Sequence, residues 1–175
     1  PLGNGGSDIE ATTYANAADK SLIISGQIGK KINKHSVDLN FTTIQSSGRF
    51  LMPREWGREP FYTFMPRERN EGAGNVNAIS ANAKVVVNSQ FKILSAYGKF
   101  FLPSTANTLQ NKYALPSYNQ FNILLNHTFS KTLKGLVIRG LYVRKDLMDK
   151  QIENPRFIFN KGNMNLYHLI LDYTF

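Results

Sequence analysis

The sequence contains no cysteine among its 175 residues, which excludes disulfide bonds and thiolate metal sites. It also lacks any run of about 18 apolar residues, so we expect no membrane-spanning helix. A signal peptide is not visible, and the chain opens with PLGNGG and without methionine, so we expect it to be processed or to lack its beginning. Convincing helical periodicity is missing as well, which leaves β-strands as the expected secondary structure.

The chain is basic, with a formal net charge of +9. Such a balance favours partners that carry negative charge, namely nucleic acid, an anionic membrane surface or acidic small molecules. Aromatic residues are abundant for a chain with so little continuous hydrophobicity, with 12 Phe, 8 Tyr and 1 Trp. Composition alone therefore leaves several classes of partner open.

Apolar and polar residues alternate with a period of two in seven stretches, which predicts seven β-strands. Each stretch has nine to thirteen residues, whereas strands of soluble proteins usually have about five or six. The stretches are Lys20–Ile32, Ser36–Ile44, Asn75–Val87, Gln90–Leu102, Asn119–Phe129, Gly135–Lys145 and Asn163–Phe175.

In most of these strands the apolar and aromatic side chains share one face, and the opposite face carries Asn, Gln, Lys and Arg. The polar faces include three basic residues, Lys84, Lys99 and Arg139, and also Asp38 and Asp172. The fourth stretch is less regular, and there we place Leu94, Ala96 and Phe100 opposite Ser95, Tyr97 and Lys99.

The expected connections alternate in length. Three are short, near Lys31–His35, Asn88–Ser89 and Ser130–Lys134, and three are long, at Gln45–Gly74, Pro103–Pro116 and Asp146–Gly162. Long strands, short turns at one end and long loops at the other are typical of transmembrane antiparallel β-barrels. A soluble sandwich or a lipocalin-like barrel also alternates, but its strands are shorter and its loops less asymmetric.

The last strand alternates up to the final residue, with Tyr167, Leu169, Leu171, Tyr173 and Phe175 on one face. This ending resembles the C-terminal signature of bacterial outer-membrane barrels, which the barrel-assembly machinery recognises. If the last strand ends at the periplasm, counting back makes the first predicted strand run inward from the outside. A bacterial single-chain barrel has an even number of strands, so seven strands cannot form a complete one. We therefore expect residues 1–175 to be the C-terminal portion of one larger barrel domain. The alternative is a weak eighth strand within SDIEATTYAN, which would give a small closed barrel.

The longest loop, residues 45–74, combines charge, aromatic rings and proline. Five arginines face four glutamates there, a net charge of only +1: Arg49, Arg54, Arg58, Arg67 and Arg69 against Glu55, Glu59, Glu68 and Glu71. Proline stiffens the segment and glycine permits sharp turns, so we expect the loop to fold into the lumen and narrow it. An arginine that no glutamate matches could bind a carboxylate there. The alternative is a structural loop whose charges are all paired internally.

The motif PREWGREPFYTFMPRERNEG in this loop, together with the terminal strand, resembles the OprD family of substrate-specific outer-membrane porins. The resemblance implies a barrel of about 18 strands in a Gram-negative bacterial outer membrane, through which small, often carboxylate-bearing nutrients diffuse. It implies that this loop constricts the pore, with the site residues Arg54, Arg58, Arg67, Arg69, Glu55, Glu59 and Glu68. It also implies a ladder of basic side chains along the lumen, for which Lys84, Lys99 and Arg139 are the candidates. The expected partners are the bilayer with its lipopolysaccharide, the remaining N-terminal strands and small anionic solutes.

Other chemistry finds little support in the sequence. The three histidines have no metal-ligand spacing, and no nucleophile, paired-carboxylate or phosphate-loop pattern is present, so we expect no metal, no cofactor and no enzyme activity. Nucleic-acid binding would need aromatic rings beside the basic side chains, whereas here they lie on opposite faces. A non-transporting adhesin or structural anchor remains the alternative to a porin.

Overall fold

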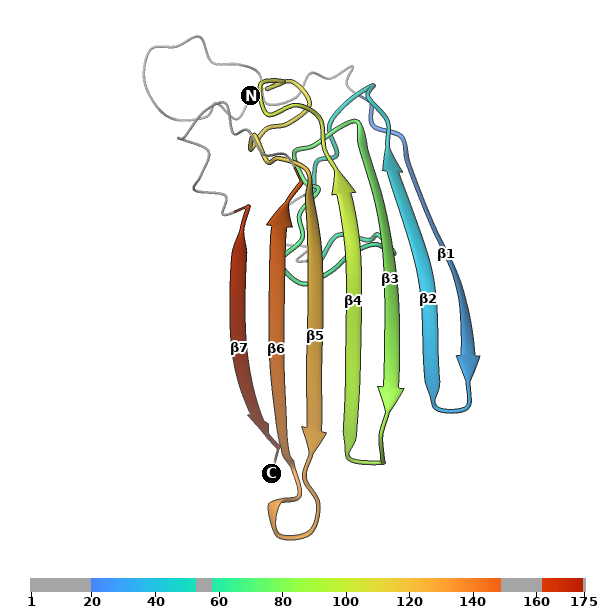
Figure 1. Ribbon diagram of the computed structural model, residues 1–175, viewed down its shortest axis with the longest axis vertical. Coiled ribbons are helices and arrows are strands. Elements are labelled where there is room, and N and C mark those ends of the chain that lie inside the picture. The colour runs from blue at the N-terminus through green and yellow to red at the C-terminus, as the bar shows by residue number, and fades with distance from the viewer. Residues whose placement is uncertain (1–19, 53–57, 149–161, 175) are drawn as a thin grey trace.

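The computed structural model describes residues 20–52, 58–148 and 162–174, which form one seven-stranded antiparallel sheet. The strands are β1 (Ile23–Ile32), β2 (His35–Ile44), β3 (Val76–Val86), β4 (Phe91–Phe101), β5 (Tyr118–Thr128), β6 (Leu136–Leu147) and β7 (Met164–Tyr173). Each strand pairs with the next one along the chain, so the sheet is a simple meander with β1 and β7 at its edges (Figure 1). The only helical segment in the described part of the chain is the short η2 (Lys131–Leu133). The all-β expectation is confirmed.

The connections differ in length at the two ends of the strands. Two residues join β1 to β2, with Asn33 in the left-handed region at a φ of 54°, and short segments also join β3 to β4 and β5 to β6. The long connections leave the strands at the other end of the sheet (Figure 1). They follow β2, β4 and β6, as the sequence predicted. The SDIEATTYAN stretch lies outside the described residues.

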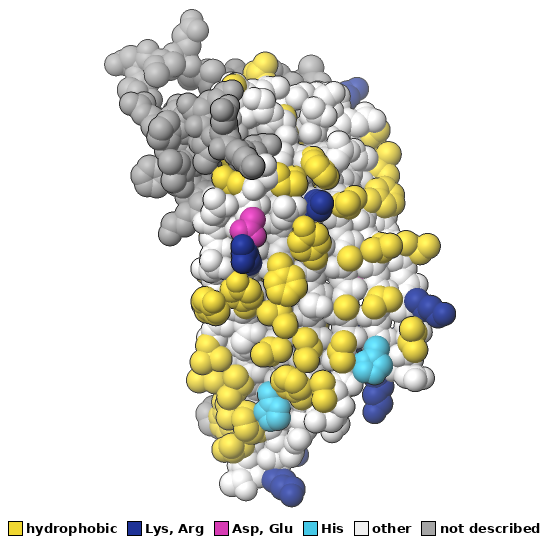
Figure 2. Space-filling model, in the orientation of Figure 1, with side chains coloured by type: hydrophobic (Ala, Val, Ile, Leu, Met, Phe, Trp, Pro, Cys, Tyr) yellow, Lys and Arg dark blue, Asp and Glu magenta, His cyan; other side chains and the backbone are white. Residues whose placement is uncertain are grey.

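One connection, the segment that follows β2, turns back along the sheet and lies across one of its faces, which we call the covered face. The opposite face is the open face. Strand register assigns alternate residues to the two faces, so that Thr42, Ala78 and Gln120 lie on the covered face while Leu39 and Phe121 lie on the open face. Figure 2 shows the open face, over which hydrophobic side chains are spread from edge to edge.

The predicted faces are correct for most strands. In β4 the predicted grouping is correct, with Leu94, Ala96 and Phe100 opposite Ser95, Tyr97 and Lys99, but the side of the sheet expected for each group is wrong. Lys99 pairs with Ile79 of β3 and lies on the open face, whereas Phe100 pairs with Ala78 on the covered face. The physical reason is that β4 has no clear polar side: its covered face must supply apolar side chains beneath the loop. Lys99 therefore does not share a face with Lys84, which pairs with Leu94 on the covered side.

The buried apolar core lies between the covered face and the segment that crosses it. One cluster joins Phe50 and Phe61 of the loop, whose ring centroids are 4.8 Å apart, to Ile44 and Val76 of the sheet. A second cluster places Met65 of the loop against three covered-face residues, Ala78, Phe100 and Tyr118. The rings of Phe100 and Tyr118 stack at 4.8 Å. Burial of these side chains is what holds the loop against the sheet.

Gly98 of β4 gives a test of this packing. A Cβ atom at this position would lie 2.9 Å from Sδ of Met65 and 2.8 Å from a ring carbon of Phe100. We therefore expect Gly98→Val to push the loop off the sheet and to lower the free energy of unfolding in urea by about 1–3 kcal/mol, as overpacking does. Trypsin should also cleave faster after Arg67.

Gly140 on the open face of β6 is the matched control, because nothing lies within 4 Å of its added Cβ. Gly140→Val should change neither the urea midpoint nor the cleavage rate. Equal behaviour of the two variants would mean that the loop does not rest on β4.

Candidate functional site

The first part of the loop is bound to β1 and β2 through hydroxyl groups. The backbone N–H of Tyr62 donates to Oγ of Ser25 at 3.1 Å, and the hydroxyls of Thr63 and Thr42 are hydrogen bonded at 2.8 Å. Ser25 and Thr42 are themselves linked at 2.9 Å. Thr63 and Thr42 are both buried, so these bonds form away from bulk water, where an unpaired hydroxyl would be costly.

The next part of the loop is bound to β5 and β6. The carbonyl oxygen of Pro66 accepts hydrogen bonds from the side-chain amides of Gln120 at 2.7 Å and Asn122 at 3.1 Å. The ammonium of Lys145 donates to the carbonyl oxygen of Arg67 at 2.9 Å and lies 4.0 Å from the centroid of the Tyr118 ring. The segment therefore crosses the covered face from β1 to β6.

The loop keeps its shape through two buried glutamates that bind amide groups. Glu59 accepts the backbone N–H groups of Asn70 and Glu71, both at 2.7 Å, and the side-chain amide of Asn70 at 2.9 Å. Glu68 accepts the backbone N–H of Met65 at 3.1 Å and a short bond from the same Asn70 side chain. Asn70 is fully buried and bridges the two carboxyl groups.

These contacts correct one expectation about the charges. In the described part of the loop, the only arginine–glutamate salt bridge joins Arg69 to Glu71, at 2.9 Å. Glu59 and Glu68 bind amides instead, because a loop with tight turns presents N–H groups that need acceptors. Arg54 and Glu55 lie outside the described residues.

Burial changes the acidity of both glutamates. Desolvation raises the pKa of Glu68 well above its ordinary value of 4.5, and the neighbouring Glu59 carboxylate raises it further, against a smaller lowering by the Met65 N–H and Lys145. Desolvation also raises the pKa of Glu59, although its hydrogen bonds from Asn70 and Glu71 oppose the shift. Two carboxyl groups that share one amide in a dry site favour at least one bound proton.

The arginines of the loop have different surroundings. Arg69 is held between Glu71 and the hydroxyl of Tyr113, which it contacts at 3.0 Å, and lies 4.3 Å above the Tyr113 ring. Arg58 is exposed and lies 6.0 Å from the Phe64 ring. Arg67 is exposed too, and no hydrogen bond or salt bridge joins its guanidinium to another described residue.

Arg67 also has an unusual backbone, with a φ of 72°. The left-handed region is disfavoured for a residue with a Cβ atom, so the surrounding bonds must hold it there. They include the contact from Lys145 to its carbonyl oxygen. The result is that the Arg67 side chain is presented at the surface of the loop.

A cavity of about 270 Å³ lies beside this arginine. Its lining includes the cations Arg67, Arg69 and Lys145, and one carboxylate, Glu71. Tyr113 from the connection between β4 and β5 completes the polar wall. Three cations against one anion make this cavity suited to a small solute with a carboxylate group.

The remaining predicted site residues are distributed over both faces. Arg139 lies on the covered face and forms a salt bridge with Asp172 of β7. Lys84 lines a second cavity, of about 340 Å³, between the covered face and the loop residues Phe64 and Pro66. Lys99 is on the open face, so the three predicted rungs do not form one ladder.

The aromatic and aliphatic residues of the last strand lie on the open face, where Tyr167, Leu169, Leu171 and Tyr173 are exposed. Phe175 lies outside the described residues. Sequence reasoning missed Asn70, Gln120, Asn122 and Lys145 as site residues. Gln120 and Asn122 stood on a predicted polar face, but nothing in their spacing indicated that a loop would bind them.

No group of three or more His, Cys, Asp or Glu residues that could hold a metal ion occurs in the described part of the chain. None of the described helical segments is long and apolar enough to cross a membrane. Comparison with known proteins found no matching family model, no matching curated protein and no matching solved structure.

The raised pKa of Glu68 predicts how stability depends on pH. Between 4.5 and the raised pKa, the folded protein binds more protons than the unfolded chain, so the free energy of unfolding falls as pH rises through this window. At a pH where such a group is protonated in the folded protein and ionised in the unfolded chain, it changes the free energy of unfolding by about 1.4 kcal/mol per pH unit. Glutamine cannot titrate, so we expect the free energy of unfolding of Glu68→Gln, measured in urea, to depend less steeply on pH between pH 5 and 8. The dependence that remains comes from Glu59. A slope as steep as in the unsubstituted protein would contradict the assignment.

Proposed function

We propose that this sheet is part of a transmembrane antiparallel β-barrel in a bacterial outer membrane. The open face supports the proposal, because Ile28, Leu39 and Leu171 on it are 75%, 62% and 63% exposed. Soluble monomers rarely expose one contiguous apolar surface of this extent, and a lipid bilayer would cover it. The short turns at one end and the long connections at the other agree with such a barrel.

The two edges of the sheet require further strands. In lipid, each unpaired backbone N–H or C=O group costs several kcal/mol, and an open sheet would expose a row of them along β1 and β7. We infer that other strands of the same barrel close the sheet. A barrel of about 18 strands, as the resemblance to the OprD family implies, would need about eleven more.

We further propose that the barrel is a porin for small, carboxylate-bearing solutes. The observation that carries this function is the loop itself, which crosses the covered face from Ser25 of β1 to Lys145 of β6 and would narrow a pore enclosed by that face. The cavity beside Arg67 would then offer solutes a cationic contact within the constriction. Several modest contacts of this kind permit both entry and release.

A non-transporting adhesin or anchor accounts less well for the loop. Such a protein presents its long connections to the outside, where they meet their partners. Here Thr63 and Asn70 are fully buried. Thr63 is hydrogen bonded to Thr42 of the sheet, and Asn70 binds the two glutamates that fix the shape of the loop. A loop committed in this way is suited to shaping an interior.

Variants of Arg67 and Arg69 distinguish an arginine that contacts the solute from one that holds the loop in shape. In the barrel reconstituted in planar bilayers, we expect Arg67→Gln to weaken carboxylate binding about tenfold and to shift selectivity away from anions, because one charged hydrogen bond of about 1.5 kcal/mol is lost. Single-channel conductance should stay close to that of the unsubstituted protein. Current block by a small carboxylate such as benzoate measures the binding.

Arg69→Gln is the matched variant, since Arg69 is bound to Glu71 and Tyr113. Its loss should loosen the loop and raise conductance and current noise. The proposal fails if deleting residues 58–74 from the barrel changes neither conductance nor selectivity. The adhesin or anchor function would then be the better one.

A further inference from the structure

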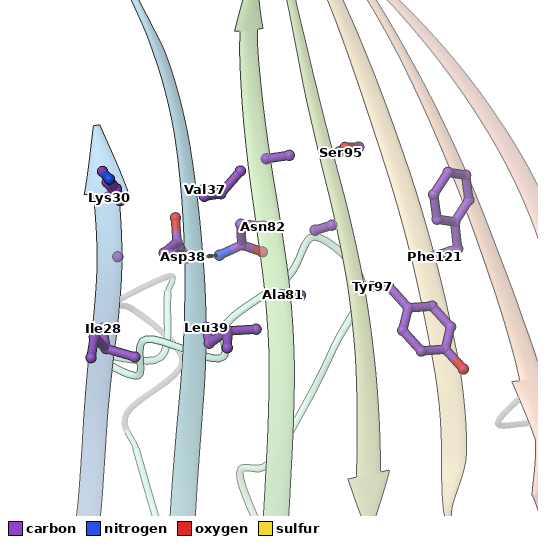
Figure 3. A pocket seen from close by; sticks show the side chains of 13 residues that line it. Ile28, Lys30, Val37, Asp38, Leu39, Ala81, Asn82, Ser95, Tyr97 and Phe121 are labelled. Carbon is purple, nitrogen blue, oxygen red and sulfur yellow. Dashed lines mark hydrogen bonds between the residues drawn. The ribbon is translucent and has the colours of Figure 1, made fainter. Parts of the chain in front are cut away.

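The open face carries a broad groove whose floor is made of small side chains. Ala81 and Ala83 of β3 and Ser95 of β4 form the floor, in a cavity of about 750 Å³. Figure 3 shows Leu39 and Ile28 on one side of it and Tyr97 on the other. Because small residues stand between rows of large ones, the groove is long and apolar. This shape suits the hydrocarbon chains of a lipid.

One cation lines an end of the groove, and a second lies in the cavity that adjoins its other end. Lys30 of β1 lines the end near the short turns, where it pairs with Val37. Lys99 of β4 is exposed on the same face, toward the long connections. It lines an adjoining cavity of about 320 Å³, which shares Leu39, Ala81 and Tyr97 with the groove. Among the described residues, no hydrogen bond or salt bridge engages the Lys99 ammonium.

Further polar groups lie in line with Lys99 across the open face. Asn119 of β5 pairs with Lys99 in the strand register, and Asp146 of β6 pairs with Asn119. Asp146 binds the guanidinium of Arg144 through two hydrogen bonds of 2.8 and 3.1 Å. The side-chain oxygen of Asn119 is buried without a hydrogen-bond partner. A headgroup with hydrogen-bond acceptors for Lys99 and hydroxyl donors for the oxygens of Asn119 and Asp146 would match these groups.

We propose that the groove binds one lipid of the outer leaflet, a phosphorylated glycolipid, with its acyl chains on Ala81 and Ala83 and a phosphate at Lys99. The inference rests on the proposed membrane function, which places the end with long connections at the outside. Charge complementarity selects the occupant, because Lys99 has no salt-bridge partner among the described residues and lies at the end where an anionic headgroup would lie. A second copy of this chain would leave that charge unmatched, and an inner-leaflet phospholipid would place its phosphate at Lys30 instead.

The test measures lipid binding to the intact barrel, extracted in mild detergent, by native mass spectrometry. Lipid A is the glycolipid probe and phosphatidylglycerol the phospholipid probe. We expect the barrel to retain lipid A, and Lys99→Gln to reduce its affinity about fivefold, which corresponds to about 1 kcal/mol for one charge near a membrane surface. Ala83→Phe should reduce it as well by filling the groove.

Lys30→Gln is the matched control, because it removes an exposed lysine from the end of the groove that lies away from Lys99. It should leave lipid A binding unchanged. The inference is overturned if Lys30→Gln weakens binding and Lys99→Gln does not, if phosphatidylglycerol binds as tightly as lipid A, or if the groove is occupied by a second copy in a stable dimer. Heat-dependent migration of the unsubstituted protein in gels tests the barrel separately, so that failure of the lipid site and failure of the membrane function are distinguishable.

Discussion

The bonds between the loop and the covered face are the constraint on which the other features depend. Side chains of β1, β2, β5 and β6 bind the backbone or hydroxyl groups of Tyr62, Thr63, Pro66 and Arg67. These bonds need polar residues on the covered face, and the apolar clusters between them need Phe100 and Met65 to be buried. One face is therefore both polar and packed, while the other is left apolar and exposed.

The amide network inside the loop explains how so many charges coexist in a small space. Glu59 and Glu68 bind N–H groups that tight turns leave without partners, and Asn70 joins them. Arg69 is bound to Glu71. None of the described glutamates of the loop forms a salt bridge with Arg67, so this cation is available to the cavity beside the loop. The near balance of charge in the sequence gives no sign of it. Sequence counting alone gives a net charge, whereas the structure separates the structural cation from the exposed one.

Much of the fold follows from patterns that depend on neighbouring residues only. Alternation along β2, β3, β5 and β7 predicted their faces, because successive side chains of a strand point to opposite sides. A short link was predicted near Lys31–His35, and the structure has a two-residue turn there. The face of β4 was predicted wrongly, since Phe100 and Lys99 are placed by contacts with a loop far away in the sequence. The partners of Glu59 and Glu68 could not be predicted either, because which N–H groups lack acceptors is decided by the folded turns.

The central claim is that the two faces of the sheet meet different media, lipid on one side and water on the other. The chain has no cysteine, so single cysteines can be placed along β5 without interference. In bilayers, a cysteine at Asn126 on the covered face should react with a membrane-impermeant thiol reagent, and one at Leu125 should not. A cysteine at Gln120, beneath the loop, should react only after residues 58–74 are deleted. Equal labelling of the Asn126 and Leu125 positions would contradict the account, because both faces would then meet water.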